Sequence, residues 1–243
     1  MRKKLSLLLA CSFIIVSLSA CGKKNDVDDL PTVNDKTEQV TTESNGNNPG
    51  NNATTSDATR GDATVKTAHN IVGYYEGSNT YVNELAGFKL VVDEVNWNFL
   101  SAEEVAKSMG LEEKDIKDLW EGKKSPYDQK DSNMAVCAIA ANKKNGSNII
   151  VDYYYVSTDI NKETTSQYYL SVAAKRHENA EFKTVKFVDK DFDALIIPPE
   201  EGSTVTQVMY ATKVNDLIVI ISFSLNEGDK IENIESMFKP LQN

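Results

Sequence analysis

Two apolar stretches constrain most strongly what this chain can fold into. Residues 217–221 are apolar at every position, and residues 136–141 contain only apolar or small side chains. A strand with one solvated face alternates between apolar and polar residues, whereas a strand covered on both faces does not. The two stretches therefore predict a β-sheet with a packed layer on each face, and helices are the expected layers.

The turns between the apolar segments predict that this sheet is mostly antiparallel. Asn145-Gly146, a pair that favours a tight hairpin turn, separates strands expected at residues 134–141 and 149–157. Further strands are expected at residues 79–85, 88–93, 182–188, 195–197, 205–214 and 217–224. The predicted class is α/β of the α+β type, a mostly antiparallel sheet flanked by helices on both faces.

Four helices are expected to provide the covering layers. They are placed at residues 101–110, 112–121, 162–178 and 229–239. Ser101 and Glu104 have the spacing of a capping box, and Gly110 follows as a typical helix end. Asp229 is expected to cap the last helix, and Phe238 to face the core from it.

The N-terminus has the three-part layout of an export signal. Arg2, Lys3 and Lys4 precede an apolar run over residues 5–16, which is too short and wrongly flanked for a membrane span. The next residues, Leu18-Ser19-Ala20-Cys21, resemble the lipobox of bacterial lipoproteins. The resemblance implies that residues 1–20 are removed and that Cys21 carries a diacylglycerol whose acyl chains include palmitate. The alternative is an ordinary signal peptide with an incidental cysteine.

Composition divides the remaining chain into a tether and one domain. Residues 21–68 are rich in Asn, Thr, Asp, Ser and Gly, and such a segment cannot bury enough apolar surface to fold. Residues 69–243 hold the apolar periodicity and are predicted to form a single globular domain. This domain carries a formal charge of −10, which argues against nucleic acid as a partner. The strong preference for Lys over Arg, together with abundant Asn, suggests an AT-rich genome, such as that of a low-GC Gram-positive bacterium.

Few residues in the domain suggest chemistry. His69 lies at the end of the tether, and His177 lies near the end of a predicted helix, where a histidine commonly complements the helix dipole. Cys137 lies among apolar residues of a strand, where a thiol is usually an inert core side chain. No metal, cofactor or catalytic residue is assigned from the sequence.

One acidic segment has the carboxylate spacing of a calcium-binding loop. Asp189, Asp191 and Asp193 are followed by Glu200 at the twelfth position. However, Ala194 replaces the glycine that the loop needs for its turn, and Pro198-Pro199 would block the helix that follows it. The expected alternative is an acidic surface turn.

The start of the domain resembles a known family. Tyr81-Val82-Asn83, Gly87-Phe88-Lys89-Leu90 and Trp97 are similar to the opening of PsbP-like domains, in which a strand hairpin precedes a helix. The order of expected elements over residues 79–238 is similar as well. The resemblance implies a sandwich fold used mainly by non-catalytic accessory and partner-binding proteins, and it implies no active-site residue.

Together these patterns predict a membrane-anchored lipoprotein on the extracytoplasmic side of the cell membrane. The domain is expected to be a non-catalytic binding or accessory module for an unknown envelope protein or cell-wall partner. The alternative is a cell-wall-associated hydrolase that uses acidic residues, since distant carboxylates can act together without a recognisable motif.

Overall fold

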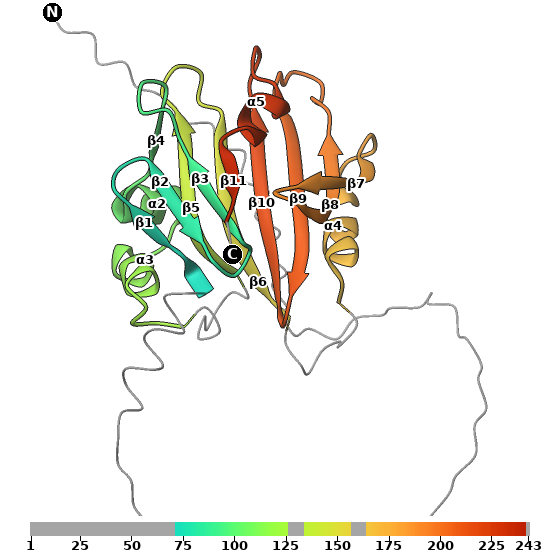
Figure 1. Cartoon of the computed structure of the whole chain (residues 1–243). Helices are drawn as coiled ribbons and strands as arrows, with labels where there is room; N and C mark the ends of the chain where they lie inside the picture. Colours follow the sequence, from blue (N-terminus) through green and yellow to red (C-terminus); the bar gives the residue numbers. More distant parts are fainter. Residues whose placement is uncertain (1–70, 126–133, 157–163, 242–243) are drawn as a thin grey trace, which may run out of the picture.

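Seven strands of the described chain form the larger of two antiparallel sheets (Figure 1). The computed structural model describes residues 71–125, 134–156 and 164–241. In spatial order the strands are β4 (Trp97–Phe99), β5 (Met134–Asn142), β6 (Asn148–Tyr155), β10 (Leu217–Leu225), β9 (Thr206–Val214), β8 (Lys190–Ile197) and β7 (Glu181–Phe187). The fully apolar segments that predicted burial on both faces lie in β5 and β10.

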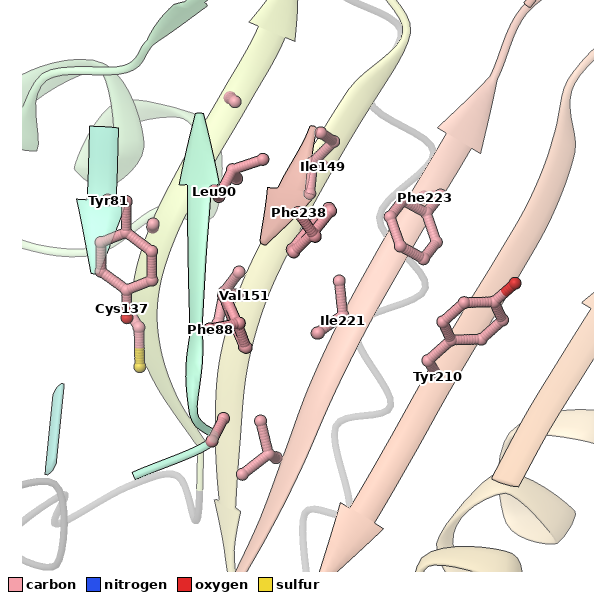
Figure 2. Close-up of a cluster of buried hydrophobic side chains, with 14 of the residues drawn as sticks. Tyr81, Phe88, Leu90, Cys137, Ile149, Val151, Tyr210, Ile221, Phe223 and Phe238 are labelled. Atoms are coloured by element: carbon pink, nitrogen blue, oxygen red, sulfur yellow. The ribbon is translucent and has the colours of Figure 1, made fainter. Parts of the chain in front are cut away.

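A smaller antiparallel sheet packs against one face of the larger sheet. Its order is β1 (Tyr74–Glu76), β2 (Thr80–Asn83), β3 (Phe88–Val91) and β11 (Phe238–Pro240). Figure 2 shows Tyr81 beside Cys137 of β5, and Phe88 and Leu90 beside Val151 and Ile149 of β6. Phe238 from β11 joins the same apolar layer. This apolar layer is the main core of the domain.

Three helices cover the opposite face of the larger sheet. Helices α2 (Ala102–Met109) and α3 (Glu113–Trp120) pack over β5, and α4 (Ser166–Ala174) packs over β8 and β9. A short helix, α5 (Ile231–Glu235), lies on the side of the smaller sheet and buries Ile234 in the main core. None of the helices in the described residues is long and apolar enough to cross a membrane.

The predicted α/β class of the α+β type, with antiparallel strand pairing, is confirmed, and so is burial of the larger sheet on both faces. One layer differs from the prediction. Helices were expected on both faces of the larger sheet, but a four-stranded sheet covers most of one face. The reason is visible in β3, where Phe88 and Leu90 are buried and the alternate residues Lys89 and Val91 are not. This period of two makes a one-faced sheet that covers the core as a helix would.

Several local predictions are confirmed. Ser101 and Glu104 form the expected capping box of α2, and Gly110 ends that helix in the left-handed conformation. The hairpin at Asn145-Gly146 joins β5 and β6. Each strand extends one residue further towards the turn than predicted, and β6 ends at Tyr155, before the predicted end at residue 157.

The predicted final helix is wrong beyond its first turn. Lys230, rather than Asp229, occupies the N-cap, and Asn145 Nδ2 donates a hydrogen bond to the carboxylate of Asp229 at 2.8 Å. The helix ends at Glu235, and Phe238 pairs with Leu90 as the first residue of β11. Open backbone groups at the edge of β3 make a strand pairing available there that the helical periodicity does not reveal.

Candidate functional site

The tips of two hairpins border the candidate site, a half-open surface hollow of about 650 Å³. Its lining residues are Tyr74, Val82, Glu84, Gly87, Lys89, Val188, Asp189, Lys190, Pro240 and Leu241. Tyr74, Val82 and Lys89 are cross-strand neighbours on the outer face of the smaller sheet and form the floor. The turn between β7 and β8 forms a wall, and the end of the chain after β11 forms part of the rim.

The two hairpin tips are held together by Lys190. Its Nζ donates a hydrogen bond to the carbonyl oxygen of Ala86 at 2.8 Å. A Cβ atom on Gly87 would lie 2.7 Å from the same Nζ, and Gly87 has a φ of +79°. Glycine therefore satisfies both the left-handed turn and the close approach of the ammonium group.

The opposing turn, Val188-Asp189, has both residues in the left-handed region, with φ values of +46° and +63°. A two-residue turn with positive φ at both positions matches the twist of a hairpin, but a β-branched residue is rarely found there. The strain at Val188 costs about 1–2 kcal/mol. Backbone strain of this kind is concentrated at functional sites in proteins, which supports the hollow as the candidate.

Asn83 shapes the other turn from inside the protein. Its Oδ1 accepts a hydrogen bond from the backbone N–H of Ala86 at 2.9 Å, and its carbonyl oxygen accepts one from Gly87 at 2.8 Å. The side chain is fully buried. The position of the hollow therefore depends on a buried amide.

The same amide joins the two sheets. Asn83 Nδ2 donates hydrogen bonds to the hydroxyls of Tyr81 at 3.0 Å and Tyr153 at 2.6 Å. The two hydroxyls in turn donate to the carbonyl oxygens of Val72 and Ile71 at 2.5 and 2.6 Å. Tyr81 and Asn83 are the tyrosine and asparagine that carry the sequence resemblance, so these two motif positions have a structural role. Tyr153, which completes this network from β6, was not singled out in the sequence.

The acidic segment that suggested a calcium loop does not adopt that form. Asp189 lies in the hairpin turn, and Asp191 and Asp193 are strand residues of β8. Ser166 Oγ donates a hydrogen bond to Asp193 at 2.5 Å, and Glu200 lies beside His177. An extended strand cannot wrap its carboxylates around one ion, which is what the loop requires.

We expect calcium to leave the stability of the domain unchanged. Melting curves recorded in millimolar calcium and in a chelator should superimpose. A bound ion at a hundred times its dissociation constant would add about 2.7 kcal/mol, or several degrees in a domain of this size. A rise of that size that Asp191→Asn abolishes would contradict the geometry described above.

His177 forms a contact that the sequence did not reveal. Its Nδ1 lies 2.7 Å from Oε1 of Glu200, which joins the end of α4 to the connection between β8 and β9. Its Nε2 is buried and has no hydrogen-bond partner within the described residues. The ring therefore has a structural partner in Glu200. His69 lies outside the described residues, as do Cys21 and the tether.

Two further ionisable groups are enclosed in the core. Cys137 is buried at a bulge of β5, and burial, with a contribution from Asp152, raises the pKa of its thiol well above the usual value. This confirms the prediction of a core side chain. Asp152 in β6 is only 6% exposed, and burial raises its pKa to about 8. Within the described residues its Oδ1 has no hydrogen-bond partner. The sequence analysis missed Asp152, although a carboxylate inside an apolar strand was a visible signal.

No protein-family model matches the chain, and no curated protein matches it. The solution structure of cyanobacterial PsbP (CyanoP) from Synechocystis sp. PCC 6803 is similar, with a TM-score of 0.38 and 10% identity over 69% of this chain and 98% of that chain. At this level of similarity no site or function is transferred.

Proposed function

We propose that this chain is a lipid-anchored extracytoplasmic protein whose domain binds a partner in the cell envelope and is not an enzyme. The observation that carries the proposal is Leu18-Ser19-Ala20-Cys21, placed directly after a charged start and a short apolar run. Two acyl chains on Cys21 would anchor the protein stably, whereas a single chain gives only reversible binding.

The tether sets the distance between the lipid anchor and the domain. As a flexible coil, residues 22–68 would span about 35–40 Å root-mean-square between the lipid and the domain. The domain, residues 69–243, would then sit away from the bilayer, where an envelope protein or the cell wall is accessible. Its charge of −10 does not favour docking on anionic lipid, so the anchor and the binding surface are separate parts of the chain.

The chemistry of the domain supports binding rather than catalysis. Burial raises the pKa of both Cys137 and Asp152, and both side chains lie inside the core. A general acid or base must come within hydrogen-bond reach of the reacting group. The hollow between the two hairpins instead presents charged side chains held by neighbouring strands and turns, an arrangement suited to recognition.

The anchor is tested by metabolic labelling with an alkyne fatty acid. Wild-type protein and the Cys11→Ala variant should both be labelled, because Cys11 lies in the segment that is removed. The Cys21→Ala variant should be unlabelled and should keep its first 20 residues, because the acyl acceptor and the cleavage signal are lost together. Equal labelling of Cys21→Ala and wild type would refute the anchor.

The binding role is tested by crosslinking in intact cells. We expect the wild type to give discrete crosslinked products with envelope proteins or wall material, identified by mass spectrometry. The Cys21→Ala variant should lose these products if the partner is reached only from the membrane. Release of product from wall material by the purified domain would instead favour the hydrolase.

A further inference from the structure

The hollow carries fixed positive charge on one side. Lys190 Nζ uses one of its three protons on the carbonyl oxygen of Ala86, and Lys89 Nζ lies 2.8 Å from a carboxylate oxygen of Glu76. Each ammonium group therefore retains donors for a further acceptor. The hydrogen bond to Ala86 places the ammonium group of Lys190 at the rim of the hollow.

The hollow also contains two carboxylates that are available to a ligand. The carboxylates of Glu84 and Asp189 line it, and neither has a hydrogen bond or ion pair within the described residues. Asp189 belongs to the strained turn, which fixes the backbone from which its carboxylate extends. Two available carboxylates thus share one hollow with two anchored ammonium groups.

We propose that this hollow binds a short peptide with a free amino end, a free carboxyl end and small apolar side chains. The amino end pairs with Glu84 or Asp189, and the carboxyl end pairs with Lys190 or Lys89. This inference rests on the proposed binding function and names its ligand class.

The balance of charge favours a zwitterion over a simple ion. A purely anionic ligand would meet Glu84 and Asp189, and a purely cationic one would meet the two lysines, so each would face like charge. Apolar contact comes from Val188 and Leu241, which are both partly exposed. The volume, about 650 Å³, lies within the range of about 300–1,000 Å³ found for small-molecule sites.

Three related dipeptides separate the contributions of the amino end and the carboxyl end. Calorimetric titration of the full chain in detergent would compare alanyl-alanine, its N-acetyl derivative and its C-terminal amide. We expect each blocked peptide to bind at least about tenfold more weakly than alanyl-alanine, because each lacks one charge-assisted hydrogen bond. Hydrogen exchange should slow in segments 84–90 and 186–191 on addition of alanyl-alanine.

Variants assign each end of the ligand to one side of the hollow. Lys190→Gln should weaken the binding of alanyl-alanine, so that alanyl-alanine no longer binds more tightly than its C-terminal amide. Asp189→Asn leaves the contact between Lys190 and Ala86 in place. It should reduce the difference in affinity between alanyl-alanine and its N-acetyl derivative. Lys183→Gln, an exposed change on β7 outside the hollow, is the matched control and should bind as the wild type.

The inference is overturned if the three dipeptides bind equally, if none binds at millimolar concentration, or if protection falls outside the two segments. Lipid labelling at Cys21 and crosslinking in cells do not depend on these results. A protein that is lipidated and crosslinks to an envelope partner but ignores all three peptides retains the proposed function and loses this ligand class.

Discussion

The Asp152→Asn variant should be more stable than the wild type at neutral and alkaline pH, and equally stable in acid. The carboxyl lies in β6 between Val136 of β5 and Ile220 of β10, and it faces the layer that contains Tyr169 of α4. Burial raises its pKa to about 8, against about 3.9 in an unfolded chain. At pH 7 the folded protein therefore favours the protonated carboxyl, whereas the unfolded chain favours the carboxylate.

Proton linkage gives the direction in which the stability of the wild type changes with pH. Because the folded pKa is the higher one, the folded state binds the proton more tightly, and this contribution to stability is complete below about pH 4. It is lost progressively as the pH rises towards 8, and the loss amounts to several kcal/mol. Asparagine has the same shape and does not titrate, so the variant keeps its stability across this range.

Urea unfolding at pH 4, 7 and 9 measures the effect. The difference in the free energy of unfolding between Asp152→Asn and the wild type should grow with pH and become constant above the folded pKa of Asp152. Asp191→Asn, an exposed change on β8, is the control and should follow the wild type at each pH. A constant difference at all three values would show that Asp152 is not protonated in the fold.

Asn83→Ala should give the second large effect, a loss of about 3 kcal/mol in the free energy of unfolding. The change removes the acceptor of the Ala86 N–H and the donor to two tyrosine hydroxyls, all within the interior. A buried polar group left without its partner costs about 1–3 kcal/mol. In a domain of this size the melting temperature should fall by about 6–12 °C.

A double-mutant cycle separates the network from simple loss of packing. Asn83→Ala and Tyr153→Phe both remove the direct contact between the amide and the hydroxyl, so their combined cost should differ from the sum of the two separate costs. Asn233→Ala, an exposed asparagine in α5, is the matched control and should change stability by less than about 0.5 kcal/mol. Strict additivity of Asn83 and Tyr153 would contradict the coupling.

Local signals predicted local structure well. Ser101, Glu104 and Gly110 mark the ends of α2 because capping depends on residues within one turn. The same holds for the hairpin at Asn145-Gly146, where the turn chemistry is contained in two residues. The end of the chain was mispredicted because Phe238 satisfies a helical spacing, while its actual partner Leu90 lies far away in sequence.

The candidate site could not be predicted in this way. Lys190 and Ala86 are 104 residues apart, and the packing of the smaller sheet against the larger one brings them together. His177 and Glu200 were both noted in the sequence, but for unrelated reasons, and the contact joins them across two elements. Asp152 was hidden because its neighbours Val151 and Tyr153 point to the opposite face, and the strand was interpreted by its apolar majority.

The central claim is that the domain is held at the membrane by lipid on Cys21. It is tested most directly by the intact mass and N-terminal fragmentation of the protein extracted from membranes of the source cell. The account predicts a chain that begins at Cys21 with a diacylglycerol on its thiol, and no species that retains residues 1–20. A chain that begins at another residue, or at Cys21 with a free thiol, would contradict it.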